Sequence, residues 1–253
     1  MAFSKSLRIS RSGLKLFLEC PRCFWLTNHH NIKRPPSFPY TLSSAVDFLV
    51  KQEFDKYRKE GTLPPVFKSE NLDAKLFDGP QLPEWRENFK GVSYIDEDLD
   101  ATLYGAVDDL LEFSDGSISV IDYKSTGSRE INIYNDYRQQ MDIYSYLISR
   151  NGLEANPNAY FVYYKVNKEG GGFDNVLPFT EELRKVDVEY SWVPEVFERA
   201  VLMARQPKSP NPAPDCKHCD YVARVCGQPF SEPTTRKATD KSSDEPEYIP
   251  IVD

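Results

Sequence analysis

Two charged residues, Asp122 and Lys124, interrupt an otherwise apolar segment at residues 117–125. The segment has the composition of a β-strand, in which residues two positions apart project from the same face. A second carboxylate, Asp108, ends a turn at residues 105–108 and is expected on the neighbouring strand. Two carboxylates beside an ammonium group can bind a hard divalent cation and assist phosphodiester hydrolysis. A solvent-facing ion pair is the alternative for an isolated Asp-x-Lys, but a central apolar strand makes an unpaired carboxylate costly.

The five cysteines lie only near the two ends of the chain, as Cys20, Cys23, Cys216, Cys219 and Cys226. Two Cys-x2-Cys pairs have the spacing of metal ligands, and disulfides are not expected in a reducing cytoplasm. Buried free thiols are the alternative for any single cysteine. Four thiolates would suit zinc or a [4Fe–4S] cluster, and either would join the two ends of the chain.

The remaining pattern predicts the elements that position these residues. Helices are expected after Ser10, with a break at Pro21, and over residues 42–57, 134–150 and 193–205. Strands are expected over 101–113 and 117–124, joined by a Ser-Asp-Gly turn, and over 159–166 and 171–179. Residues 61–100 are expected to be irregular, with one short helix around Trp85. A strand–helix–strand crossover within this order predicts an α/β domain with a mixed central sheet flanked by helices.

Length and composition indicate one domain over residues 1–228 and a disordered acidic tail over 229–253. No stretch has the length of a membrane helix or a signal peptide, which predicts a soluble cytoplasmic protein without a membrane partner. The net charge of −8 argues against a protein that coats nucleic acid indiscriminately. A net negative charge is still compatible with a local basic groove.

Taken together, five motifs in this order resemble the RecB-like branch of the PD-(D/E)XK nuclease superfamily. The closest likeness is to CRISPR-associated RecB-type exonucleases and to the iron–sulfur nuclease domain of AddB. The motifs lie at residues 20–26, 105–108, 120–124, 140–144 and 216–226. The resemblance implies a restriction-endonuclease-like fold, a mixed central sheet flanked by helices, whose N- and C-terminal segments are joined by a cysteine metal centre.

Carried over residue by residue, the resemblance makes Asp108 and Asp122 ligands of Mg²⁺ or Mn²⁺ and Lys124 the catalytic lysine. It places Gln140 and Tyr144 beside the metal, where they help to position DNA; a surface amide and a core tyrosine are the alternatives. Asp47 stands where relatives commonly have a metal-binding histidine, and it could equally be an ordinary helix-surface residue. Asp109 is expected to face the other way and is left out of the site.

The family pattern uses one N-terminal and three C-terminal cysteines for a [4Fe–4S] cluster, which here selects Cys20, Cys216, Cys219 and Cys226. Cys23 stands where relatives usually carry another residue. A two-plus-two set with Cys23 in place of Cys226 therefore remains open, and it would favour Zn²⁺.

These inferences predict a metal-dependent deoxyribonuclease, acting as an exonuclease on single-stranded DNA ends. One alternative is a catalytically silent subunit, cross-linked by its cysteine-bound metal, that binds DNA or supports assembly. Another is a component of CRISPR spacer acquisition, and the resemblance also implies recombination or CRISPR-adaptation proteins as partners.

Overall fold

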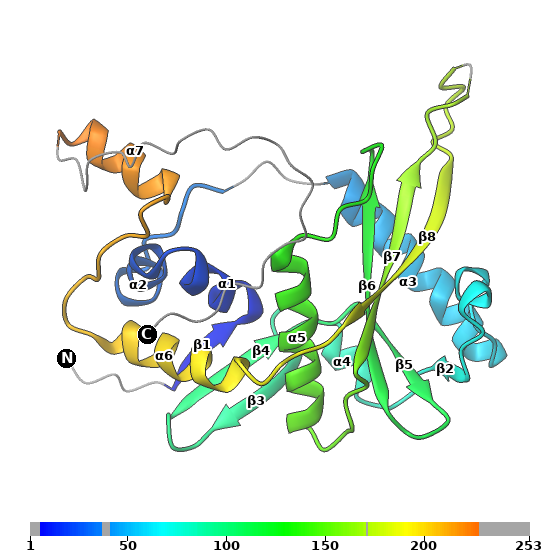
Figure 1. Ribbon diagram of the computed structural model, residues 1–253, viewed down its shortest axis with the longest axis horizontal. Helices are drawn as coiled ribbons and strands as arrows, with labels where there is room; N and C mark the ends of the chain where they lie inside the picture. The colour runs from blue at the N-terminus through cyan, green and yellow to red at the C-terminus, as the bar shows by residue number, and fades with distance from the viewer. Residues whose placement is uncertain (1–5, 37–40, 171, 228–253) are drawn as a thin grey trace.

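The computed structural model describes residues 6–36, 41–170 and 172–227, so the tail expected at 229–253 lies outside the described residues. The described chain forms two β-sheets with helices packed around them (Figure 1). This arrangement confirms the predicted α/β class with mixed sheets flanked by helices. None of the described helices is long and apolar enough to cross a membrane.

The larger sheet contains the strand that carries Asp122 and Lys124. Its five strands run in the order β2 (Ala74–Leu76), β5 (Asp109–Phe113), β6 (Ile118–Thr126), β7 (Asn158–Val166) and β8 (Phe179–Asp187). The β5–β6 pair is the predicted antiparallel hairpin. Strands β6 and β7 pair in parallel, because helix α5 (Asn135–Arg150) carries the chain back across the sheet. Strand β6 is buried from Ile118 to Tyr123, as the apolar segment predicted.

The smaller sheet has the order β1 (Leu7–Ser10), β4 (Ala101–Gly105) and β3 (Val92–Asp96). The prediction of one strand over 101–113 is therefore wrong, because β4 and β5 belong to different sheets. Between β4 and β5 the backbone makes hydrogen bonds that do not belong to strand pairing. Val107 N donates to Trp85 O at 3.1 Å, and Arg86 Nε donates to Asp108 O at 2.9 Å. These bonds fix the bend just before β5. The strand expected over 171–179 is also absent from the described residues there, and β8 begins only at Phe179.

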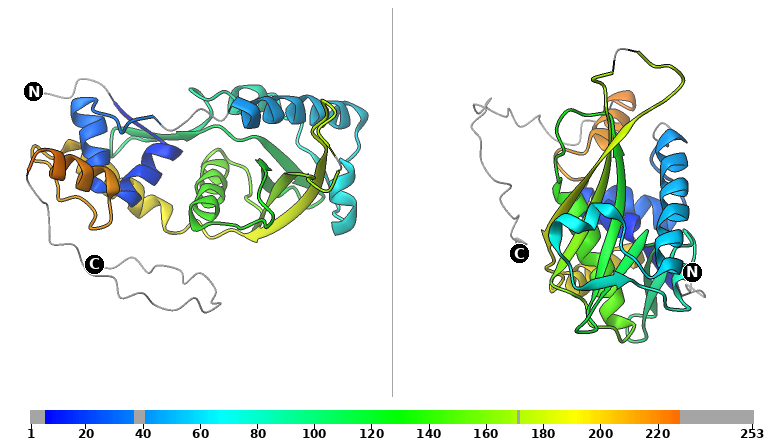
Figure 2. Two further views of the ribbon diagram at one scale, coloured as in Figure 1. Left: turned by 90° about the horizontal axis from the view of Figure 1, so that it is seen from above. Right: turned by 90° about the vertical axis from the view of Figure 1, so that its right-hand side faces the viewer.

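Helices cover both faces of the larger sheet. Helix α3 (Thr41–Glu60) packs on one face through Val50 and Phe54, together with η1 (Pro65–Glu70); Figure 2 shows α3 running along this side. The opposite face packs on α5 within the main core, which α1, α6 and the smaller sheet complete.

The remaining helices gather at the other end of the molecule (Figure 1). They are α1 (Arg11–Glu19), α2 (Pro21–His30), α6 (Val193–Arg205) and α7 (Lys217–Val225). Ser10 caps α1 as predicted, since its side chain accepts a hydrogen bond from Gly13 N at 3.0 Å. Pro21 does not kink one long helix but opens a second one, at the first helical position where proline is well tolerated. The short helix expected around Trp85 is α4 (Leu82–Trp85).

Candidate functional site

Asp122 is a buried carboxylate held from two sides. Its side chain, on β6, projects toward α5 and is 2% exposed. One oxygen, Oδ1, accepts a hydrogen bond from Gln140 Nε2 at 2.5 Å. The other, Oδ2, forms an ion pair with Lys124 Nζ but has no hydrogen-bond partner of suitable geometry among the described residues. The Lys124 ammonium is therefore the counter-charge of Oδ2, which accepts no well-formed hydrogen bond within the described chain.

The electrostatic environment of Asp122 disfavours its negative charge. Burial is the largest cause and the charge of Asp108 the second, and together they raise the pKa of Asp122 to about 7, although Lys124 acts to lower it. A carboxyl group in this state gains most from an added cation. Carboxylate oxygens, the donors that Asp108 and Asp122 supply, are the ligands that hard divalent cations prefer.

Asp108 and Asp47 share a lysine that sequence reasoning did not single out. Lys51 Nζ, on α3, lies 2.8 Å from Asp108 Oδ1 and 2.9 Å from Asp47 Oδ2. Burial and the nearby charge of Asp108 raise the pKa of Asp47. Burial acts to lower the pKa of Lys51, but the charge of Asp108 and its hydrogen bond raise it overall. The four-residue helical spacing of Asp47 and Lys51 was the only sequence signal for this pair.

A buried ion network supports Asp108 from the α3 side of the sheet. Asp109 is fully buried and pairs with Arg58 and, at 2.6 Å, with Arg86, while Tyr123 Oη donates to it at 2.8 Å. Asp109 therefore does face away from Asp122, as expected. The same network reaches Asp108, because Arg86 donates to its carbonyl oxygen and Tyr123 N donates to its Oδ2 at 3.0 Å.

Tyr144 lies next to this site rather than in direct contact with Asp122. Its ring packs against Gly105, where an added Cβ would lie 2.6 Å from Tyr144 Cε1. The Arg11 guanidinium lies 6.0 Å from the ring centre. The glycine of the turn at 105–108 thus has a steric reason: only a residue without a side chain lets α5 approach β4 this closely.

Asp47 and Asp108, but not the buried Asp122, open into a cavity of about 570 Å³. Asp47, Lys51, Asp108 and Lys124 line it, as do Ser43, Ser44, Val46, Arg86, Asn88, Tyr123, Ser125, Tyr137 and Tyr164. Lys124 Nζ lies 4.8 Å from the centre of the Tyr137 ring, so a cation–π contact holds the ammonium at the cavity wall. Of the predicted residues, Gln140 and Lys124 contact Asp122 directly. Asp108 acts on Asp122 through its charge and shares Lys51 with Asp47. Tyr144 packs against Gly105.

At the other end of the molecule, four cysteine sulfurs converge. Ligand atoms of Cys20, Cys23, Cys216 and Cys219 all lie within 4.8 Å of one another, and all four residues are buried. Each Cys-x2-Cys pair occupies a helix start, since Cys20 is the N-cap of α2 and Cys216 the N-cap of α7. Burial acts to raise the pKa of Cys20, but hydrogen bonds from the backbone of Cys23 and Ala213 lower it to about 7.

Cys226 does not join this group, so the structure departs from the preferred ligand set. It is exposed at the far end of α7. Cys226 lies seven positions after Cys219, which corresponds to about 10 Å along the helix axis. Cys23, the open alternative, takes its place, because α2 and α7 bring their first turns together.

Comparison with known proteins identifies a family. A family model described as the PD-(D/E)XK nuclease superfamily matches residues 41–227. A solved structure titled "Crystal structure of SSO0001" covers 88% of this chain and 87% of its own, with 14% sequence identity and a TM-score of 0.41. A likeness of that strength supports no conclusion about fold or activity. The comparison with curated proteins gave no match.

Proposed function

This chain belongs to the PD-(D/E)XK nuclease superfamily, and on that premise we propose that it is a metal-dependent deoxyribonuclease. The observation that carries the proposal is Asp122, a fully buried carboxylate whose pKa is raised to about 7 beside Asp108 and Lys124. Such an arrangement is costly for a protein that only folds or binds. A divalent cation held by Asp108 and Asp122 would offset this cost.

Each residue of the site has a role that follows from its contacts. Asp108 and Asp122, with Asp47, would hold Mg²⁺ or Mn²⁺; when bound, the ion supplies an activated water and neutralises charge on the phosphate. Gln140 holds Asp122 Oδ1, and the Lys124 ammonium lies against Oδ2. Lys124, kept at the cavity wall by Tyr137, stabilises negative charge that develops on the phosphate oxygens.

The substrate we propose is single-stranded DNA, cleaved from an end. Tyr137, a half-buried tyrosine of the cavity wall, supports an unpaired strand, because aromatic side chains stack on exposed bases. Exonuclease action and partners from recombination or CRISPR adaptation come from the family resemblance, and a cytoplasmic location is proposed from the sequence pattern. Co-purification of the full chain with its neighbours in the cell would test the partners.

A silent binding or assembly subunit is the rival function. It is disfavoured because a binding-only module gains nothing from the cost of ionising Asp122. The deciding assay uses end-labelled single- and double-stranded DNA with Mg²⁺, Mn²⁺ or a chelator, and compares the wild type with Asp122→Asn. We expect metal-dependent shortening from the ends of single strands by the wild type alone. Metal-supported activity that survives in Asp122→Asn, or a wild type that cleaves no DNA, would reject the proposed mechanism.

The four buried cysteines supply a second, structural part of the proposal. They would bind a metal that joins α2 to α7, two helices separated by almost the whole length of the chain. Such a cross-link lowers the conformational entropy of the unfolded chain. In sites of this kind the metal-binding free energy contributes directly to folding.

A further inference from the structure

The spacing of the four cysteine sulfurs discriminates between the metals that four thiolates can bind. Cys23 Sγ lies 3.6 Å from both Cys216 Sγ and Cys219 Sγ, and Cys20 Sγ lies 3.8 Å from Cys219 Sγ. Sulfurs at about 2.3 Å from one zinc ion, at the corners of a tetrahedron, are about 3.8 Å apart. In a [4Fe–4S] cluster each cysteine binds a different iron of the cube, so the sulfurs must be spread further apart. From this difference we propose that Cys20, Cys23, Cys216 and Cys219 bind a single Zn²⁺, not the [4Fe–4S] cluster that the family resemblance implied.

The surroundings of the sulfurs also suit a compact thiolate site. Both cysteine pairs lie at helix N-termini, where backbone N–H groups and the helix dipole favour thiolates. Ala213 N donates to Cys20 Sγ at 3.4 Å, and Arg34 Nη2 lies 3.7 Å from Cys216 Sγ. Four thiolates around Zn²⁺ leave an excess of negative charge, which Arg34 partly offsets.

Metal analysis of the full chain, expressed in medium that supplies both iron and zinc, tests the assignment without any activity measurement. We expect one zinc per chain, little iron and a colourless protein. Replacement by Co²⁺ should give the visible absorption of a tetrahedral thiolate site. A brown protein with about four irons and matching sulfide after anaerobic purification would overturn the proposal.

Two matched variants then identify the ligands. Cys23→Ser should lose the zinc, whereas Cys226→Ser, which changes an exposed thiol, should keep one zinc per chain. The reverse result would reject this ligand set. Should Cys23→Ser fail to fold, the Co²⁺ spectrum of Cys226→Ser still decides, because four thiolates must remain. Arg34→Gln should weaken zinc binding by about 10-fold, measured by chelator competition, as expected for loss of an outer-shell partner.

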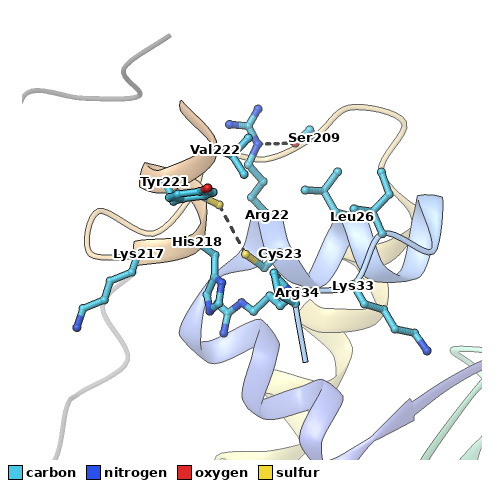
Figure 3. Close-up of a pocket in the computed structure, with 13 residues that line it drawn as sticks. Arg22, Cys23, Leu26, Lys33, Arg34, Ser209, Lys217, His218, Tyr221 and Val222 are labelled. Atoms are coloured by element: carbon cyan, nitrogen blue, oxygen red, sulfur yellow. Dashed lines mark hydrogen bonds between the residues drawn. The ribbon is translucent and has the colours of Figure 1, made fainter. Parts of the chain in front are cut away.

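A separate observation concerns the pocket beside this centre, shown in Figure 3. It has a volume of about 530 Å³, and Leu26, Ile32 and Val222 provide apolar walls. None of its lining residues among the described part of the chain is acidic, although the protein carries a net charge of −8. Lys33 and Lys217 extend from its rim (Figure 3). The pocket thus combines apolar walls with a local positive charge.

We further propose that this pocket is a subsite that binds single-stranded nucleic acid. The choice of ligand rests on the proposed nuclease function. Tyr221 lines the pocket and is 69% exposed, which makes its ring available for stacking on a base. Lys33 and Lys217 would contact the adjacent phosphates. Cations around an exposed aromatic ring are the usual elements of sequence-tolerant single-strand binding.

Fluorescence anisotropy with a labelled single-stranded oligonucleotide tests this subsite. The measurement uses the full-length Asp122→Asn protein without Mg²⁺ or Mn²⁺, so binding is read independently of cleavage. Adding Lys33→Glu and Lys217→Glu together should weaken binding by about 10-fold or more and reduce its salt dependence by about two phosphate contacts. Tyr221→Ala should weaken binding by about 5-fold or more, whereas Lys185→Glu, on the exposed surface of β8, should have little effect.

Unchanged affinity in both pocket variants would reject the subsite. Loss of binding in the pocket variants together with an inactive wild type would keep the subsite while rejecting the nuclease.

Discussion

Replacing Asp122 by Asn should stabilise the metal-free protein at alkaline pH while abolishing cleavage. The pKa of Asp122 is raised from 3.8 to about 7, chiefly by burial, which corresponds to about 4 kcal/mol of folding free energy when the group is ionised. Because the pKa is raised in the folded state, this group favours folding below pH 4, and that contribution is lost as the pH rises toward 7. The expected slope in this window is about 1.4 kcal/mol per pH unit.

Asparagine cannot ionise, so the variant should escape this cost. The raised pKa already includes the attraction of Lys124, so a net gain of about 4 kcal/mol at pH 8 is the expected result. The gain should shrink to near zero by pH 4. Urea unfolding of both proteins at several pH values, in buffer free of Mg²⁺ and Mn²⁺, measures the difference directly.

Asp109 offers the matched control, since it is equally buried but paired with Arg58 and Arg86. Asp109→Asn should destabilise the protein by about 3–5 kcal/mol, because it leaves two buried cations without their partner. Mn²⁺ at about 100 times its dissociation constant should stabilise the wild type by about 2.7 kcal/mol and leave Asp122→Asn unaffected. If Asp122→Asn instead lowers stability at pH 8 as Asp109→Asn does, the Asp122 carboxylate is a structural ion-pair partner and the metal-site reasoning is refuted.

Other substitutions test neighbouring parts of the site. Lys124→Met should reduce the cleavage rate by about 100-fold while keeping stabilisation by Mn²⁺ in thermal unfolding; loss of that stabilisation would make Lys124 part of metal binding instead. Asp47→Asn should raise the Mn²⁺ concentration needed for half-maximal cleavage by about 10-fold, as expected for loss of one ligand, and an unchanged titration would return Asp47 to the helix surface. Lys51→Met should increase the stabilisation gained from Mn²⁺, because Lys51 competes for Asp47 and Asp108; an unchanged gain would show that the lysine does not compete. Gly105→Ala should lower the unfolding free energy by about 1–3 kcal/mol through collision with Tyr144, whereas Gly127→Ala, with no atom nearer than 3.7 Å to the added Cβ, serves as the neutral control.

The sequence by itself determined the features that depend on short-range pattern. The apolar run of β6 identified a buried strand, and the two-residue period of strands was enough to put Asp122 and Lys124 on one face. The Ser-Asp-Gly turn specified the β5–β6 hairpin in the same way. Each of these predictions depends on neighbours within a few positions, where alternation and turn chemistry leave few choices.

Only the tertiary structure decided which distant residues meet. The chain bends after β4 because Val107 and Arg86 make hydrogen bonds that do not belong to strand pairing. This bend divides the single predicted strand between two sheets. Lys51 approaches Asp108 across 57 positions of sequence, an approach set by how α3 packs on the sheet. Cys23 rather than Cys226 completes the sulfur cluster because α2 and α7 meet at their first turns. Spacing along the chain cannot predict these contacts, since they follow from the packing of whole helices and sheets against one another.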